Sequence, residues 1–224
     1  MSNIVFPPLQ VPKITSWMFN GLNGMTVPGR SSTNTGNVGN FIDQYLKTQM
    51  GIANTTSTVD LASLGIELKS KDIHTNTDWS IGSMTLQDIL GTPYIQSSVY
   101  QKLQALLLVY TDDIFQVIKN LELHYFDFDE VQQLLADSYE SARQEIQHRV
   151  NLHAAMIAQQ VVAGNPNAIL QKVQFKNYEK FHGQFGKFEF TNTGSSFMFR
   201  ISLPQMKHLT SLSSAYHNKL FTFE

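Results

Sequence analysis

The sequence predicts an α/β protein with a central mixed β-sheet flanked by helices, and three stretches support this fold class. Residues 64–73 alternate polar and apolar side chains, which is typical of a strand with one buried face. Residues 105–110, ALLLVY, form an apolar run that suits a strand covered on both faces. Residues 129–164 predict one long helix or two abutting helices, with Asp129 as the candidate N-cap.

The N-terminal part is predicted to hold loops and one clear helix. Residues 1–35 are rich in Pro, Gly, Ser, Thr and Asn, so we expect loops there and a short helix near residues 14–22. Residues 33–52 predict a helix, and residues 54–60 predict a polar turn after it. The apolar positions of this helix are Val38, Phe41, Ile42 and Tyr45.

The other strands are predicted from alternation or from apolar runs within residues 79–86, 97–111, 121–128, 185–191 and 196–203. A short helix is expected from Pro204 onward. Four phenylalanines of this region, Phe181, Phe185, Phe188 and Phe190, suit core packing better than stacking on nucleic-acid bases. With no internal repeat in the chain, residues 1–224 are assigned to one domain.

The composition is that of a globular protein. Hydrophobic residues make up 42% and charged residues 15%, which argues against disorder, and the absence of cysteine excludes disulfides and thiolate metal sites. The first residues lack the pattern of a signal peptide, and no apolar run approaches the roughly 20 residues that span a bilayer. We therefore expect a soluble, cytoplasmic protein with no membrane partner.

The charge is unevenly distributed along the chain. The net charge is −2, but residues 165–224 hold seven Lys or Arg against three acidic residues. A basic segment joined to an acidic remainder suits a protein that holds a polyanion on one side and a divalent metal on the other. Chance asymmetry on a solvated surface accounts for the same distribution equally well.

Asp60, Glu67 and Lys69 form the candidate site. Residues two apart on a strand point the same way, so Glu67 and Lys69 project from one face about 6–7 Å apart, followed by Lys71. Asp60 ends a turn and folds back beside Glu67 if the chain bends, which Gly65 allows. Two carboxylates can hold Mg²⁺, and an ammonium group can orient water or support a charged transition state in phosphodiester hydrolysis. The alternative is an exposed strand face with an ordinary Glu–Lys pair.

Four ordered motifs between residues 36 and 110 resemble the MutH-type endonucleases. The motifs are GNVGNFIDQYL, VD, LGIELKSK and SSVYQKLQALLLVY. These enzymes are PD-(D/E)XK nucleases and include the MutH mismatch-repair nicking enzyme and related type II restriction enzymes. The resemblance implies a restriction-endonuclease-like fold with a catalytic core over about residues 36–110.

The resemblance also implies roles for individual residues. Asp60, Glu67 and Lys69 would be the catalytic triad, with Asp60 and Glu67 as the Mg²⁺ ligands. Asp43 would match the acidic residue of the motif helix, where the family usually has Glu, and Lys102 would match an auxiliary lysine. Val59 precedes Asp60, where many members of the superfamily have Pro.

The function implied is a Mg²⁺-dependent, sequence-specific double-stranded DNA endonuclease, a type II restriction enzyme paired with a methyltransferase. About residues 165–224 would supply DNA recognition, because SSFMFRISLPQ resembles the strand that presents recognition residues in MutH-type enzymes. The candidate DNA-binding residues are Arg200, Lys172, Lys176, Lys180, Lys187 and Lys207. A strand-nicking mismatch-repair enzyme and a non-catalytic DNA-binding module stay open, as does the choice between monomer and homodimer.

Overall fold

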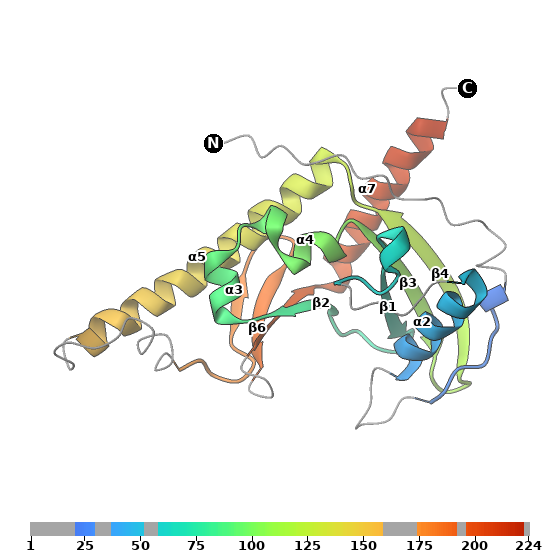
Figure 1. Ribbon diagram of the computed structural model, residues 1–224, viewed down its shortest axis with the longest axis horizontal. Coiled ribbons are helices and arrows are strands. Elements are labelled where there is room, and N and C mark those ends of the chain that lie inside the picture. Colours follow the sequence, from blue (N-terminus) through green and yellow to red (C-terminus); the bar gives the residue numbers. More distant parts are fainter. Residues whose placement is uncertain (1–20, 30–36, 52–57, 159–173, 192–195, 222–224) are drawn as a thin grey trace.

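The computed structural model describes residues 21–29, 37–51, 58–158, 174–191 and 196–221 (Figure 1). The helices of these residues are α2 (Asn37–Met50), α3 (Leu86–Gly91), α4 (Ser98–Lys102), α5 (Asp129–Ala158) and α7 (Leu203–Phe221). The strands are β1 (Glu67–Asp72), β2 (Trp79–Met84), β3 (Ala105–Asp112), β4 (Val117–Tyr125), β5 (Lys180–His182), β6 (Lys187–Thr191) and β7 (Ser196–Ile201). The predicted mixture of helices and strands is confirmed.

The strands form two sheets rather than the single central sheet expected. One sheet has the order β1-β3-β4, with β1 parallel and β4 antiparallel to β3. The other has the order β2-β7-β6-β5 and is antiparallel throughout. The chain leaves the first sheet after β1, so β2 pairs with the C-terminal strand β7. Strands adjacent in sequence are thereby separated, which local periodicity does not reveal.

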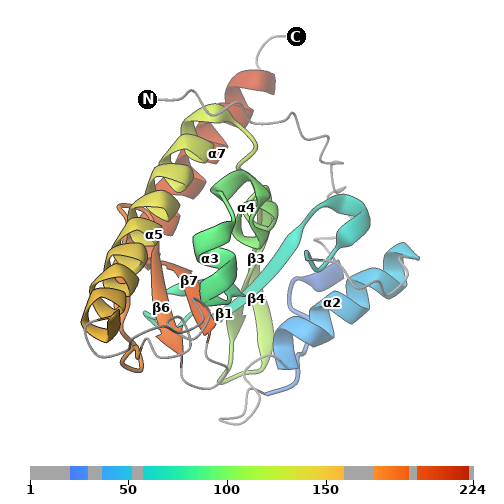
Figure 2. The same cartoon turned by 60° about the vertical axis from the view of Figure 1, so that its left-hand side comes forward.

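β3 lies between two hydrophobic cores, as its apolar run predicts. Leu106 and Leu108 pack in a core with α5 and the second sheet. Leu107 and Val109 pack in a core with α2. Figures 1 and 2 show α2 on one side of the first sheet, with α5 on the opposite side of the molecule. The first sheet is therefore covered on both faces.

The helix predicted over residues 33–52 forms as α2, with one difference in its buried face. Val38 and Ile42 are fully buried and Tyr45 packs partly buried against the same core. Phe41 is exposed instead, and Leu46 takes the next buried position one turn after Ile42. The buried apolar stripe of the helix therefore follows residues 38, 42 and 46. This spacing is expected where a helix packs on a sheet through a narrow face of the helix.

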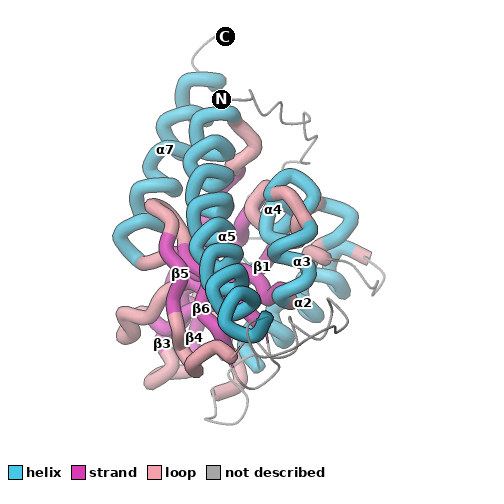
Figure 3. The backbone as a smooth tube through the Cα atoms, turned by 90° about the vertical axis from the view of Figure 1, so that its left-hand side faces the viewer, coloured by secondary structure: helices cyan, strands magenta, loops and turns pink. Residues whose placement is uncertain are grey.

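The second sheet packs against α5, which runs alongside α7 (Figure 3). Gly183 explains how close β5 comes to α5, because an added Cβ there would lie 2.1 Å from the carbonyl oxygen of Ser138. Phe181, Phe185 and Phe188 are buried, and Phe190 packs against the same core. This confirms that these rings form the core.

Several boundaries differ from the prediction. Asp129 is the first residue of α5 rather than its cap, and the helix expected from Pro204 is the 19-residue α7. The unpredicted α3 begins with a capping box in which Thr85 and Asp88 exchange hydrogen bonds. The short helix expected near residues 14–22 and most of the turn at 54–60 lie outside the described residues.

Candidate functional site

Glu67 is the centre of the site and is fully buried. The ammonium groups of Lys69 and Lys102 both donate to its Oε1, with the Lys102 nitrogen at 2.7 Å. Its Oε2 is buried and has no hydrogen-bond partner among the described residues. The face that carries Glu67 is therefore not the solvated strand face of the alternative interpretation, because α4 brings Lys102 over it.

Asp60 approaches β1 through a tight bend. The Leu61 amide donates to the Ile66 carbonyl at 2.9 Å, and Gly65 takes a φ of 65° where the chain turns back. Asp60 Oδ2 then accepts a hydrogen bond of 2.9 Å from the Leu68 amide. The structure thus brings the Asp60 carboxylate to the residue that follows Glu67.

A hollow with a volume of about 450 Å³ opens beside this cluster, between α2, β1 and the start of β2. The charged residues that line it are Asp43, Asp60, Asp78, Lys69 and Lys71. Carboxylates and ammonium groups facing one open space suit an anionic ligand that binds together with a cation.

Asp43 reaches this hollow from α2 and is paired on its own helix. Its Oδ2 lies 2.8 Å from Lys47 Nζ. Its Oδ1 is buried without a hydrogen-bond partner among the described residues. Asp43 therefore shares the hollow with Asp60 while one of its oxygens remains available for a ligand.

The carboxylates of Asp60 and Glu67 could supply the few protein ligands that Mg²⁺ needs, but not a complete coordination shell. Among the described residues, no three His, Asp or Glu side chains are grouped to hold a metal ion. Mg²⁺ needs fewer protein ligands than that, because it is commonly held by one or two carboxylates together with substrate phosphate and water. The unpartnered Oε2 of Glu67 is a hard oxygen donor of the required kind, and Asp60 supplies a second carboxylate at the amide of the next residue, Leu68.

Two of the predicted DNA-binding residues lie beside the hollow but are already paired. Lys187 Nζ is 2.6 Å from Asp78, and Arg200 Nε is 3.1 Å from Glu189. Arg200 also donates to the Ser80 hydroxyl at 2.8 Å. The second sheet therefore brings these two cations to the rim of the hollow.

The other predicted basic residues are spread over the surface. Lys180 is the first residue of β5, and Lys176 lies just before this strand. Both side chains are exposed. Lys207, on α7, is also exposed and lines a different hollow, which contains Glu122 and His124. Lys172 lies outside the described residues. The structure therefore does not gather all six candidates at one place.

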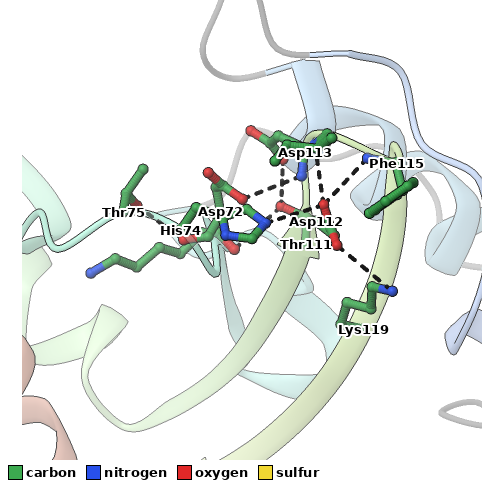
Figure 4. Close-up of polar contacts among 10 residues, drawn as sticks. Asp72, His74, Thr75, Thr111, Asp112, Asp113, Phe115 and Lys119 are labelled. Atoms are coloured by element: carbon green, nitrogen blue, oxygen red, sulfur yellow. Dashed lines mark hydrogen bonds and ion pairs between the residues drawn. The ribbon is translucent and has the colours of Figure 1, made fainter.

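A polar network braces the segment between β1 and β2 (Figure 4). The Asp112 carboxylate accepts hydrogen bonds from the amides of Ile114 and Phe115 and contacts His74 at 3.4 Å. Burial opposes ionisation of Asp112, but the hydrogen bonds from Phe115 and His74 lower its pKa. The network ties residues 72–75 to the β3–β4 turn, and this segment leads directly to Thr77 and Asp78 in the wall of the hollow.

Lys71 and Trp79 also line the hollow, although neither was assigned a role from the sequence. Lys71 is 7% exposed, donates to the Thr77 carbonyl and lies 5.1 Å from the centre of the Trp79 ring. Burial lowers the pKa of its ammonium group, although Asp78 acts in the opposite direction. The available signal was its position four residues after Glu67 on the same strand face.

The chain matches no protein-family model and no curated protein sequence. Among the described residues, every helix is too short or too polar to cross a bilayer.

Proposed function

We propose that the protein is a Mg²⁺-dependent endonuclease that hydrolyses phosphodiester bonds in double-stranded DNA. The observation that carries the proposal is the environment of Glu67, a buried carboxylate with two ammonium groups on one oxygen and none on the other. The Asp60 carboxylate accepts from the amide of Leu68, the residue after Glu67, and the hollow that Asp60 and Lys69 line contains residues of both signs of charge. A merely structural ion pair would not need the second carboxylate or the open space.

The roles of the side chains follow from their contacts. Asp60 and Glu67 would hold Mg²⁺, which neutralises a bound phosphate and lowers the pKa of a coordinated water. Lys69 lines the hollow, so its ammonium group can orient the attacking water and stabilise negative charge that develops on the phosphate. Lys102 fixes the Glu67 carboxylate in position through its hydrogen bond. Asp43, on α2, would assist these groups from its place in the wall of the hollow.

The arrangement of the motifs supports a PD-(D/E)XK type of fold. The helix that carries Asp43, the bend that carries Asp60 and the strand that carries Lys69 all line one hollow. Lys102 stands just before β3, and β3 pairs in parallel with β1. Residues that are far apart in the four sequence motifs thus meet at one site.

The proposed biological role is that of a type II restriction enzyme paired with a methyltransferase. The basic segment over residues 165–224 would then provide contacts to DNA, with Lys187 and Arg200 nearest to the hollow. Arg200 is held by Glu189 and Ser80, so its guanidinium has a fixed orientation, as a group that reads a base edge requires.

The test is cleavage of unmethylated phage DNA by purified protein in Mg²⁺. Discrete fragments are expected for the wild type and for Glu130→Gln, an exposed carboxylate at the start of α5 that serves as the control. Fragments should be absent for Glu67→Gln and in EDTA. Sequencing the fragment ends would give the recognition site.

Other outcomes distinguish the alternatives. Conversion of supercoiled plasmid only to nicked circles would favour a strand-nicking enzyme of the mismatch-repair type. Binding of DNA without cleavage in Mg²⁺ or Mn²⁺ would favour a non-catalytic module. Cleavage that is unchanged in both Glu67→Gln and Lys69→Met would overturn the proposed site.

A further inference from the structure

Lys71 differs electrostatically from the other lysines of the site. Lys69 and Lys102 share the charge of Glu67, and Lys187 is paired with Asp78. Among the described residues, Lys71 forms no ion pair with a carboxylate, and its recorded partners are the Thr77 carbonyl and the Trp79 ring. Asp78 acts on its charge but is itself paired with Lys187, so Lys71 is a lysine in the wall of the hollow without an acidic partner of its own.

The burial of this group needs an explanation. A lysine with 7% exposure loses most of its hydration, and leaving a buried charge without a counterion costs free energy. The lowered pKa of Lys71 has the same cause, because desolvation is the largest influence on it. The Thr77 carbonyl and the Trp79 ring compensate part of this cost, and an anionic ligand would supply the missing charge.

Trp79 adds a donor without a hydrogen-bond acceptor among the described residues. Its side chain is 3% exposed, and its indole Nε1 is buried without a hydrogen-bond partner among the described residues. Trp79 and Lys71 both line the hollow. A buried N–H group is normally satisfied, so the unpaired indole donor is a second indication of an absent acceptor.

We propose that Lys71 and Trp79 form a phosphate-binding subsite, distinct from the group that undergoes hydrolysis at Glu67. Lys71 lies two strand residues beyond Lys69, about 6–7 Å further along β1, so the subsite is displaced from the catalytic residues. An ammonium group binds phosphate as a point charge, and phosphate oxygens accept several hydrogen bonds. The assignment of this phosphate to a neighbouring nucleotide of DNA rests on the proposed function.

The test uses the fluorescence of Trp79. Trp17 is the only other tryptophan in the sequence, so Trp17→Phe leaves Trp79 as the single indole. This protein is titrated in EDTA with deoxythymidine 3′,5′-bisphosphate, a small piece of a DNA strand with a phosphate on each side of the sugar. The expected result is a saturable change in fluorescence. Lys71→Met should weaken binding by about tenfold or more, the effect of losing one charged hydrogen bond.

Two further variants separate charge from folding. Lys71→Arg keeps the positive charge and should bind within about threefold of the parent protein, because the loss of geometry costs less than the loss of charge. Lys119→Met removes an exposed lysine of β4 outside the hollow and should bind like the parent. Thermal unfolding checks each variant, and Lys71→Gln replaces Lys71→Met if the latter does not fold.

The outcomes keep the subsite and the nuclease activity apart. An absence of saturable binding, or equal binding by the parent and Lys71→Met, would overturn the subsite even if the wild type cleaves DNA. Binding that depends on Lys71, in a protein that cuts no DNA, would support the subsite and remove the endonuclease proposal.

Discussion

Lys102 Nζ lies 2.7 Å from Glu67 Oε1, although the two residues are 35 positions apart in the chain. This contact joins the end of α4 to the first residue of β1, and Lys69 shares the same oxygen. One carboxylate thus fixes two lysines that come from different elements. The position of each group in the site depends on the other two.

Lys102→Met should lower the cleavage rate by about 10- to 100-fold, the usual effect of losing a residue that orients a metal ligand. The variant should mainly leave the Glu67 carboxylate less well positioned and so weaken Mg²⁺ binding. A high Mg²⁺ concentration should therefore restore part of the lost rate. Steady-state cleavage of a plasmid over a range of Mg²⁺ concentrations measures this. Lys119→Met is the control, and an unchanged rate for Lys102→Met would remove Lys102 from the site.

Gly82→Ala should disturb the same contact from the other side. An added Cβ at Gly82 would lie 3.0 Å from Cδ of Lys102, so the lysine must shift by a few tenths of an ångström. Because small misplacements in an active site are costly, we expect a rate loss of about three- to tenfold. Gly91→Ala, which would meet no atom within 4 Å, is the matched control. Equal rates for both variants would contradict this account of Lys102.

The sequence predicted the local part of this site. Period-two alternation gave β1 and placed Glu67 and Lys69 on one face, and Gly65 gave the bend before it. Alternation does not determine what covers a strand face, so the full burial of Glu67 was not predicted. The cover comes from Lys102 in α4, which lies against Gly82 of β2, and the positions of α4 and β2 depend on long-range packing.

Lys71 illustrates the same limit. On the sequence it is one more charge on a polar strand face, whereas in the fold Trp79 and the Thr77 carbonyl bury it. Both partners follow a turn that redirects the chain into the second sheet. The fold class was accessible from periodicity, but the division into two sheets was not, because β2 finds its partner β7 more than a hundred residues later.

Lys71→Met should alter how stability depends on pH. The folded-state pKa of Lys71 lies below the ordinary value of 10.5, so between these two values the unfolded chain binds more protons and wild-type stability rises with pH. The variant lacks this contribution. The free energy of unfolding of the variant, relative to the wild type, should therefore fall as the pH rises toward 10.5.

Urea unfolding between pH 7 and pH 10.5 measures this difference. The same comparison with Lys119→Met corrects for the general loss of a positive charge at alkaline pH. A difference that stays constant over the whole range would contradict the shifted pKa of Lys71.

Asp112→Asn should weaken the brace beside the hollow. Because its hydrogen bonds hold the pKa of Asp112 below the ordinary value of 3.8, the ionised group stabilises the fold above that pH. This contribution is lost as the pH falls through the lowered pKa. The variant should therefore have a lower Tm than the wild type at pH 7, and the gap should narrow as the pH falls below 3.8.

Calorimetry at several pH values tests the brace, and Asp137→Asn, an exposed residue of α5, is the control. A gap between the Tm values that does not change with pH would indicate that Asp112 acts through packing alone.

Within the part of the chain that the structure describes, β1 is also the outer strand of its sheet and pairs with β3 on one side. Outer strands have unpaired backbone groups that can recruit a strand from another chain, and charged side chains turned inward are one of the devices that prevent this. Glu67 and Lys71 are both charged and buried on β1. The residues proposed to hold Mg²⁺ and phosphate are thus of the kind that discourages edge-to-edge association, so replacing both by apolar residues is expected to lower solubility as well as activity.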